Sequence, residues 1–288
     1  MHQTGQSDTN RRSRRALLVL SLLATVLVVG VGGCKRTAAP AAAAEDKLVV
    51  FAATSLRDVF TALGADFKRT HPGVELTFNF AGTQELRTQI EHGAAVDVFA
   101  SADQRHMDEL LRATRVKAPV VFARNEPVIV VTKEAAPSVH GLGDLPSLAR
   151  LVVGTPEVPI GRYTLQILDR ASTTLGSDFR ARVEAKVVSR ELNVRQVLLK
   201  VSLGEAQAGI VYRTDTQAVQ GKAAAQSNAA TQDKVSVVTI PADLNVIASY
   251  PIALVTGTQS PGLARAWVDF VLSSAGQTTL SQAGFLPP

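Results

Sequence analysis

Cysteine is nearly absent from this chain of 288 residues, because Cys34 is the only one. A single cysteine cannot form an intramolecular disulfide. Aromatic residues make up only 5% of the sequence, and no run of basic residues follows residue 36. A nucleic-acid-binding protein is expected to have a clustered basic face with aromatic platforms. The sequence therefore gives no support for a nucleic-acid partner.

The motifs of common hydrolases are missing as well. Ser55 lies in Ala53-Thr54-Ser55-Leu56 and not in a G-x-S-x-G elbow. The histidines after residue 34 have no spacing typical of a catalytic triad or a metal site; they are His71, His92, His106 and His140. Asp97 and Asp103 resemble a carboxylate pair, but capping at the end of a strand explains them better. A secreted hydrolase with Ser55 as nucleophile remains the weaker alternative.

Residues 1–46 differ in composition from the rest of the chain. A block of arginines precedes an apolar stretch from Ala16 to Val31, and Val31-Gly32-Gly33-Cys34 follows it. This order is typical of a secretory signal, and the stretch is shorter than the ~20 residues that a membrane span needs. We interpret residues 1–33 as a lipoprotein signal peptide, Cys34 as the lipidation site and residues 34–46 as a flexible tether. The alternative is an uncleaved N-terminal anchor.

The net charge of +5 comes partly from this N-terminal segment. Residues 1–33 hold four Arg and one Asp, so the remainder has 26 basic and 24 acidic residues. A chain with 46% hydrophobic residues, and a nearly neutral body after residue 33, suits a globular protein of one large or two medium domains.

From Lys47 onward, strand-like apolar runs alternate with helix-like segments. Strands are predicted at 47–53, 74–80, 96–100, 127–132, 151–154, 208–212, 235–240 and 246–255. Helices are predicted at 56–70, 84–92, 104–113, 161–175, 177–184, 193–203 and 262–283, and residues 220–232 are predicted to be an exposed connection. Such alternation indicates an α/β fold with mostly parallel sheets flanked by helices.

The long apolar runs divide this body into two expected lobes. Lobe 1 comprises residues 46–126 plus 241–288, and lobe 2 comprises residues 127–240. The strands at 127–132 and 246–255 are expected to cross between the lobes, with a cleft between them. Ligands of such sheets bind outside the carboxyl ends of the strands.

Ser55 and Thr83 each lie where a predicted strand passes into a predicted helix. The first N–H groups of a helix have no internal partner, and the helix dipole favours negative charge at that end. Two such ends in one cleft would form an anion site without Lys or Arg. Both hydroxyls can also be ordinary N-caps, since Ser and Thr are preferred there.

A family resemblance adds to this interpretation. Phe51-Ala52-Ala53-Thr54-Ser55-Leu56, Phe80-Ala81-Gly82-Thr83 and the run from Thr88 to Asp103 resemble the molybdate-binding proteins of ABC importers. Further matches are the run from Val153 to Gly161, Asn193-Val194-Arg195 and Ala208-Gly209-Ile210-Val211-Tyr212. The resemblance spans roughly residues 47–287. It implies a two-lobed periplasmic-binding-protein fold of type II with a hinge and an interlobe cleft.

The resemblance also implies the site and the partners. The ligand-binding positions fall on Ser55, Thr83, Ile160, Val194 and Tyr212. Thr83 stands where many members have Ser, and Ile160 stands where Ala is common, so Ile160 would contribute only its N–H. Arg162 could add a charge contact, although a rim position suits it better. The ligand would be molybdate or tungstate, without a cofactor or a resident metal, and the partner would be an ABC permease. The protein would be an extracytoplasmic, lipid-anchored monomer.

Hydrogen-bond chemistry supports an oxyanion that carries no proton. Molybdate has four accepting oxygens, so a site made only of donors satisfies it, whereas phosphate near neutral pH keeps a proton and needs an acceptor. An unmatched buried polar group costs ~1–3 kcal/mol. Sulfate has the same charge as molybdate, so only cavity size could exclude it. A binding protein for sulfate, phosphate or a small organic acid, and a purely structural lipoprotein, are the further alternatives.

Overall fold

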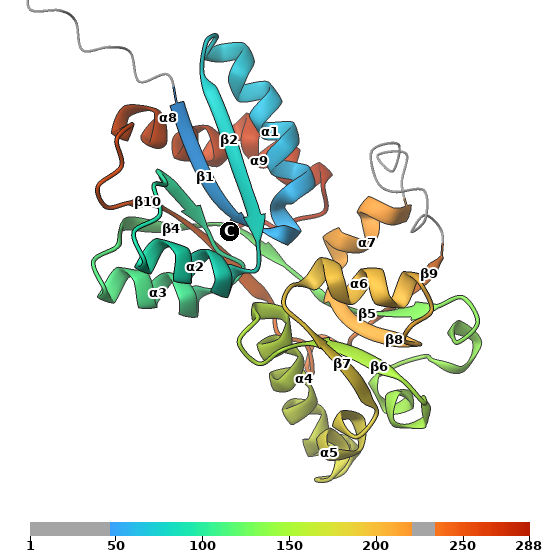
Figure 1. The fold of residues 1–288 in the computed structure, drawn as a ribbon. Helices are drawn as coiled ribbons and strands as arrows, with labels where there is room; N and C mark the ends of the chain where they lie inside the picture. Colours follow the sequence, from blue (N-terminus) through green and yellow to red (C-terminus); the bar gives the residue numbers. More distant parts are fainter. Residues whose placement is uncertain (1–46, 221–233) are drawn as a thin grey trace, which may run out of the picture. The chain divides into compact units, whose positions relative to one another are not determined.

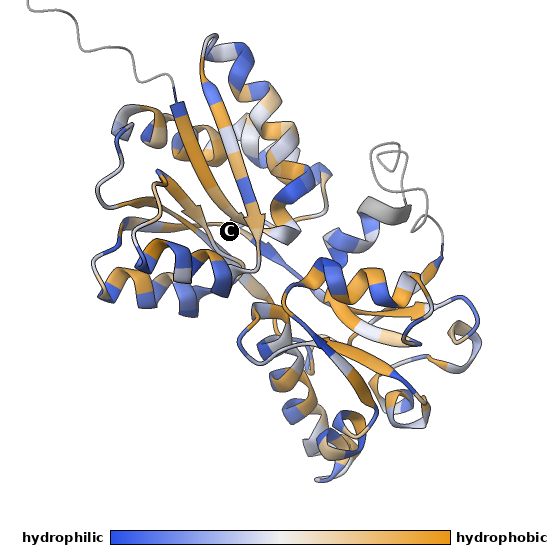
Figure 2. Cartoon of the chain, in the orientation of Figure 1, coloured by the Kyte–Doolittle hydropathy of each residue, from blue (hydrophilic) through white to orange (hydrophobic). Residues whose placement is uncertain are grey.

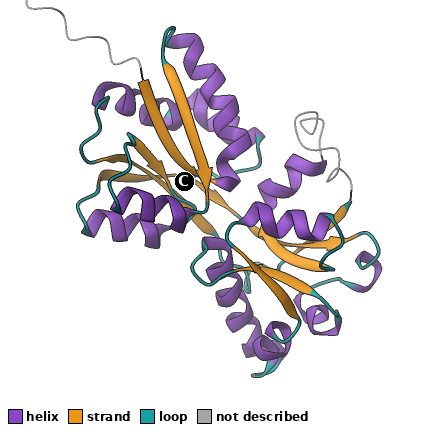
Figure 3. Cartoon of the chain, in the orientation of Figure 1, coloured by secondary structure: helices purple, strands orange, loops and turns teal. Residues whose placement is uncertain are grey.

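The computed structural model describes residues 47–220 and 234–288, which form two five-stranded sheets flanked by helices (Figures 1 and 3). The predicted α/β class and the two-lobed architecture are confirmed. The predicted signal peptide, Cys34 and the tether lie outside the described residues, as does nearly all of the connection predicted at 220–232. Within the described part of the chain, no helix combines the length and hydropathy required to cross a bilayer.

The first sheet is the centre of lobe 1. Its strands, in spatial order, are β2 (Glu75–Ala81), β1 (Lys47–Ala53), β3 (Val98–Ala100), β10 (Ala248–Val255) and β4 (Val116–Asn125). Strand β1 is parallel to β2 and β3, whereas β10 is antiparallel to β3 and β4. The helices of this lobe are η1 (Thr54–Leu56), α1 (Arg57–Thr70), α2 (Thr83–Glu91), α3 (Gln104–Arg112), α8 (Pro261–Leu272) and α9 (Ser274–Gln282).

The second sheet is the centre of lobe 2 and repeats the same plan. Its strands, in spatial order, are β7 (Val187–Glu191), β6 (Leu151–Gly154), β8 (Ala208–Tyr212), β5 (Pro127–Thr132) and β9 (Val235–Thr239). Strand β6 is parallel to β7 and β8, and β5 is antiparallel to β8 and β9. Its helices are η2 (Ala136–Ser138), η3 (Leu142–Ser147), α4 (Pro159–Leu175), α5 (Phe179–Glu184), α6 (Val194–Ser202) and α7 (Arg213–Gln220).

The alternating side-chain directions of β1 explain why the first sheet is covered on both faces. Leu48 and Val50 belong to the large core cluster, in which α1 and α8 also pack, whereas Phe51 packs in a smaller cluster with Leu86 of α2 and Met107 of α3. Figure 2 shows the strands of both sheets to be largely hydrophobic and the helices to carry polar residues on part of their surface. Burial of apolar side chains on both faces of a sheet is typical of parallel α/β architecture.

The crossing between the sheets differs from the prediction. The strands predicted to cross each lie within one sheet: β5 belongs to the second sheet and β10 to the first. The chain passes to the second sheet through the link between β4 and β5 and returns between β9 and β10. The apolar character of β5 and β10 reflects their interior positions in the sheets, where each has a neighbouring strand on both sides.

Several elements were missed or merged in the prediction. Strand β4 was missed because it contains Pro119 and has several exposed positions, and β7 was missed because it is a partly exposed edge strand. Helix α7 was also missed. The single helix predicted at 262–283 is two helices, which separate where the Ser273 side chain accepts a hydrogen bond from the Gly276 N–H and caps α9.

Candidate functional site

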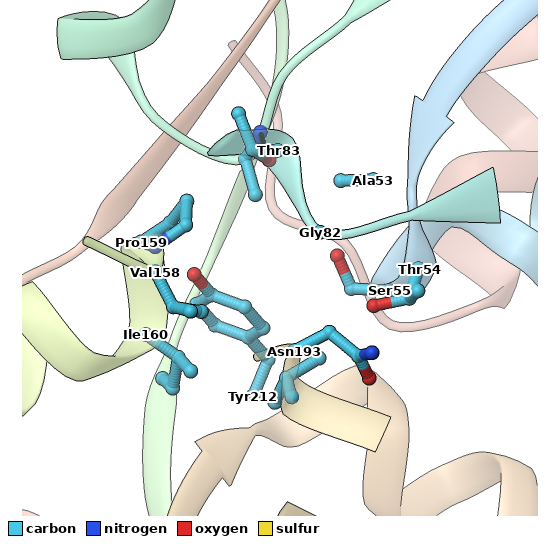
Figure 4. Close-up of a pocket in the computed structure, with 12 residues that line it drawn as sticks. Ala53, Thr54, Ser55, Gly82, Thr83, Val158, Pro159, Ile160, Asn193 and Tyr212 are labelled. Carbon is cyan, nitrogen blue, oxygen red and sulfur yellow. Dashed lines mark hydrogen bonds between the residues drawn. The ribbon is translucent and has the colours of Figure 1, made fainter. Parts of the chain in front are cut away.

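The carboxyl ends of six parallel strands meet around one small pocket. In lobe 1, β1, β2 and β3 lead to Ser55, Thr83 and Ala102. In lobe 2, β6 and β7 lead to Ile160 and Val194, and β8 ends at Tyr212. All of these residues line the same small cavity (Figure 4). The structure thus brings together all five ligand-binding residues predicted from the sequence, which lie up to 157 positions apart, from Ser55 to Tyr212.

Four helical segments begin at this pocket. Ser55 lies in η1, which continues directly into α1, and Thr83 is the first residue of α2. Ile160 is the second residue of α4 and Val194 the first residue of α6. The first N–H groups of a helix lack intrahelical partners and carry partial positive charge, so each of these starts favours an anion. No acidic residue occupies the first turn of α4 or α6.

The hydroxyl of Thr83 is oriented by the backbone of its own lobe. The Thr83 Oγ1 accepts a hydrogen bond from the N–H of Ala102 at 3.2 Å. A hydroxyl that accepts from an N–H keeps its own proton available for donation. Thr83 is therefore a donor toward the pocket, in which it is 1% exposed. The same bond means that Thr83 also supports the turn after β3.

Tyr212 contributes the least satisfied group of the site. Its side chain is buried, and its hydroxyl has no hydrogen-bond partner among the described residues. Figure 4 shows the hydroxyl oxygen directed into the space between the lining residues. Burial raises the pKa of Tyr212 well above its ordinary value, so the group stays protonated and can donate. A buried hydroxyl without a partner costs about 1–3 kcal/mol, a cost that an accepting ligand removes.

The pocket wall carries no ionisable side chain other than the Tyr212 phenol: no Asp, Glu, Lys, Arg or His is found among the described residues that line it. Its groups are hydroxyls, backbone amides, the Asn193 side chain and apolar side chains. Across residues 47–220 and 234–288, no group of three His, Cys, Asp or Glu residues is arranged to hold a metal ion. The arrangement can bind an acceptor-rich anion, and it offers no carboxylate to a group that must donate.

Arg162 lies at the edge of the site and not in its wall. Its guanidinium donates to Asp103 Oδ2 at 3.1 Å, so it joins α4 of lobe 2 to lobe 1. Asp103 is fully buried and also accepts from the N–H and the Nδ1 of His106. Burial by itself would raise the pKa of Asp103, but the bonds from His106 and the charge of Arg162 lower it below its ordinary value. The charge contact to the anion that was considered for Arg162 is directed to Asp103 instead.

Arg195 makes a second ionic link between the lobes. Its guanidinium is 2.5 Å from Asp58 of lobe 1 and 2.9 Å from Asp215 of lobe 2. Asp215 also accepts from the N–H of Tyr212 at 3.3 Å. Burial raises the pKa of Asp215 to about 6, and the charge of Arg195 opposes this shift. Both arginines therefore stand next to the pocket while their charges face carboxylates.

Further contacts close the rim between the lobes. Gln84 donates to the carbonyl of Leu192 at 2.7 Å, and Arg105 donates to the carbonyl of Glu157 at 3.1 Å. Gly82 lies so close to Leu192 that a Cβ at this position would be 2.5 Å from the Leu192 oxygen. Together with the buried state of the lining residues, these contacts indicate a closed form of the cleft.

Sequence reasoning missed the residues behind the pocket wall. Tyr250 and Asn125 are both buried and lie on β10 and β4, and they contact Ser55 directly or through each other. No local pattern distinguishes them from core residues. Asn193 had a detectable signal, because its side chain is the N-cap of α6 and asparagine before an apolar helix predicts a cap.

Comparison with known proteins agrees with the fold. Residues 48–286 match the model of the family described as bacterial extracellular solute-binding protein. The molybdate-binding protein ModA of Mycobacterium tuberculosis (strain H37Rv) is 38% identical over 279 residues, which cover 94% of this chain and 98% of that protein.

Solved structures with the same fold bind different anions. The periplasmic molybdate-binding protein of Azotobacter vinelandii superposes with a TM-score of 0.68 at 18% identity, over 84% of this chain and 99% of that chain. The sulfate-binding protein SubI of Mycobacterium tuberculosis superposes with a TM-score of 0.72, also at 18% identity, over 84% of this chain and 86% of that chain. These two likenesses show the fold, and the anion must be argued from the site.

Proposed function

Because this chain belongs to the family of bacterial extracellular solute-binding proteins, we propose that it captures molybdate outside the cytoplasm and delivers it to the permease of an ABC importer. Solute-binding proteins carry a ligand without converting it, so the hydrolase alternative is excluded, and the anion is cargo that implies no cofactor. The proposed ligand-binding groups are the hydroxyls of Ser55, Thr83 and Tyr212 and the N–H groups of Ile160 and Val194.

The observation that carries this proposal is the buried Tyr212 hydroxyl, unpartnered among the described residues, in a pocket wall that has no carboxylate. A dianion with four accepting oxygens would pair this hydroxyl and N–H groups at the starts of α4 and α6 at the same time. Charge-assisted hydrogen bonds are roughly twice as strong as neutral ones, so a balancing cation inside the wall is not required. Because the donors come from both lobes, the bound anion would stabilise the closed form.

The same wall disfavours protonated oxyanions. Hydrogen phosphate has an O–H group that needs an acceptor, and the wall offers donors at Thr83 and at the helix starts. Tungstate shares the charge and the tetrahedral shape of molybdate, so we expect it to bind as well. Sulfate also lacks a proton and differs in size, so discrimination against it depends on the dimensions of the closed cavity.

Isothermal titration calorimetry with molybdate, tungstate, sulfate and hydrogen phosphate tests the proposal. The expected result is tight binding of the first two ions and weak or no binding of the other two. Tight binding of sulfate with weak binding of molybdate would assign the protein to sulfate transport. Binding of none of the four would overturn the oxyanion function.

The proposal extends to export and anchoring. Residues 1–33 would be removed as a signal peptide, Cys34 would be acylated, and residues 34–46 would tether a monomer made of lobe 1 (46–126 plus 241–288) and lobe 2 (127–240) to the membrane. A single acyl chain gives only marginal membrane binding, so a second chain is expected on the same cysteine. Metabolic labelling with a radioactive fatty acid should mark the wild type and not Cys34→Ser; equal labelling would contradict lipidation at Cys34.

A further inference from the structure

The hydroxyl of Ser55 is connected to a buried chain of hydrogen bonds behind the pocket wall. Its Oγ lies 2.9 Å from the hydroxyl oxygen of Tyr250, and either oxygen could be the donor in isolation. Tyr250 is fully buried and does not line the pocket. Because a serine hydroxyl has one proton, the direction of this bond decides whether Ser55 offers a donor or an acceptor to a ligand.

The direction is fixed by Asn125, the last residue of β4. The Asn125 Oδ1 accepts from the backbone N–H of Glu126 at 2.9 Å. A backbone N–H can only donate, so the atom that faces it must be the amide oxygen. The amide nitrogen therefore faces the other two neighbours, and it donates to Thr214 Oγ1 at 2.8 Å and to the Tyr250 hydroxyl at 3.4 Å.

The donor-to-acceptor direction of this hydrogen bond then sets the direction of the next one. Tyr250 accepts from Asn125, and Ser55 Oγ is its only other hydrogen-bond partner among the described residues, so the Tyr250 proton is paired only when it is donated to Ser55 Oγ. Burial raises the pKa of Tyr250 well above its ordinary value, which keeps that proton on the phenol. Ser55 accepts from Tyr250, and its own proton is left for the pocket. Thr83 has the same polarity for a similar reason, because the Ala102 N–H occupies its oxygen.

We propose that Tyr250 and Asn125 are positioning residues that direct the Ser55 proton toward the pocket and thereby favour fully deprotonated oxyanions over oxyanions that carry a proton. This inference rests on the proposed function and adds a determinant that lies behind the wall. Without these hydrogen bonds, the Ser55 hydroxyl could rotate so that its oxygen accepts from a ligand hydroxyl. With them, a ligand hydroxyl at this position meets a second donor.

The test compares the dissociation constants of molybdate and hydrogen arsenate at mildly alkaline pH, where both are dianions and only the second carries a proton. Tyr250→Phe frees the Ser55 oxygen. Asn125→Asp replaces the donor to Tyr250 by an acceptor, which reverses the chain and turns Ser55 into an acceptor toward the pocket. The negative charge added in Asn125→Asp repels both dianions alike, so its effect cancels in the ratio of the two dissociation constants.

We expect the preference for molybdate to fall about tenfold in Tyr250→Phe and further in Asn125→Asp, since one mismatched buried hydrogen bond is being relieved. Tyr163→Phe removes a hydroxyl from another buried tyrosine, which lies outside the pocket lining and bonds to the backbone of Ser249, and should leave the preference unchanged. If each variant changes the dissociation constants of molybdate and hydrogen arsenate by the same factor, the positioning role is overturned. If the wild type itself fails to bind molybdate, the proposed function fails instead.

Discussion

The wall of the pocket and its rim use opposite chemistry. The wall has hydroxyls and helix N-termini and no Asp, Glu, Lys, Arg or His among the described residues, whereas the rim has several arginines, each of which pairs with a carboxylate or a carbonyl. Arg162 follows Ile160 by two positions and Arg195 follows Val194 by one, yet each pairs with a carboxylate of the other lobe, and Arg195 also with Asp215 of its own lobe. In the proposed site the neutral groups would contact the anion, whereas the charged groups link the two lobes.

This separation has a physical basis. An arginine in the wall would attract any of these anions, because the attraction of a positive charge by itself discriminates little between sulfate, phosphate and molybdate. Directed hydrogen bonds discriminate between anions by how many oxygens accept and how many carry a proton, since an unmatched partner in a buried site is costly. Charges at the rim act between surfaces that are apart when the cleft is open, so they affect closure more than selectivity.

The largest predicted effect comes from a substitution that blocks closure of the rim and changes no charged residue. In Gly82→Ala the added Cβ would lie 2.5 Å from the Leu192 oxygen of the other lobe, so the closed form is blocked. Because the donors of lobe 2 are then lost, we expect molybdate affinity to fall by at least about 100-fold, at about 1.5–3 kcal/mol for each bond to a charged group. Calorimetry measures the affinity, and chemical denaturation of the unliganded protein should show no loss of stability.

Gly141→Ala is the matched control for this change. A Cβ at Gly141 meets nothing within 4 Å, so affinity and stability should both stay at the wild-type level. Equal affinities of Gly82→Ala and the wild type would show that binding does not require the closed rim.

The next largest effect comes from a substitution in the pocket wall. Tyr212→Phe removes the hydroxyl that has no partner within the described chain, so the unliganded protein should keep its free energy of unfolding or gain slightly. Molybdate affinity should fall about 10- to 100-fold, because one charge-assisted bond is lost. Calorimetry and urea unfolding on the same variant separate the two quantities, and a loss of stability without a loss of affinity would assign Tyr212 to packing.

A smaller effect is expected from the rim pair Arg162 and Asp103. Arg162→Gln should weaken molybdate binding about fivefold, since it leaves Asp103 buried in the closed form with only His106 as partner. In the double variant with Asp103→Asn the loss should be smaller than the sum of the single losses, with a coupling of about 1 kcal/mol. Additive losses would mean that the pair does not act in closure. A change in the molybdate-to-sulfate preference would place Arg162 in recognition.

The smallest effect concerns pH and the buried carboxylate of Asp215. The pKa of Asp215 is raised to about 6, so Asp215 takes up a proton as the pH falls through that value. The neutral form no longer repels the anion or cancels the charge of Arg195, so the dissociation constant of molybdate should fall about two- to threefold between about pH 7.5 and about pH 5.5. Asp215→Asn should bind with a flat profile over this range. A profile of opposite sign in the wild type would contradict this assignment.

Much of the fold was predictable because it is local. The strand-to-helix transitions at Ser55 and Thr83 follow from apolar runs, small residues and amphipathic segments that are adjacent in the chain. The missed elements have weak local signals: Pro119 interrupts β4, and β7 is an exposed edge. The wrong crossing has a related cause, because a long apolar run shows that a strand is buried and does not show which sheet buries it.

The features of the candidate site also divide into those with a local signal in the sequence and those without one. Its donors were identifiable from their types and positions, with help from the family resemblance for Ile160, Val194 and Tyr212. The polarity of the Ser55 hydroxyl was not identifiable, since Tyr250 is 195 residues away in the sequence. The same holds for Arg162, whose partner Asp103 is 59 residues away.

The sequence by itself determined which segments become strands and helices and which hydroxyls and amides stand at helix starts, because neighbours along the chain set these features. Only the tertiary structure decided that six strand ends share one pocket, that the arginines beside it serve the rim, and that Tyr212 is left without a partner among the described residues. These outcomes depend on groups brought together from distant parts of the chain, and the direction of a hydrogen bond is settled only when both partners and their own partners are in place.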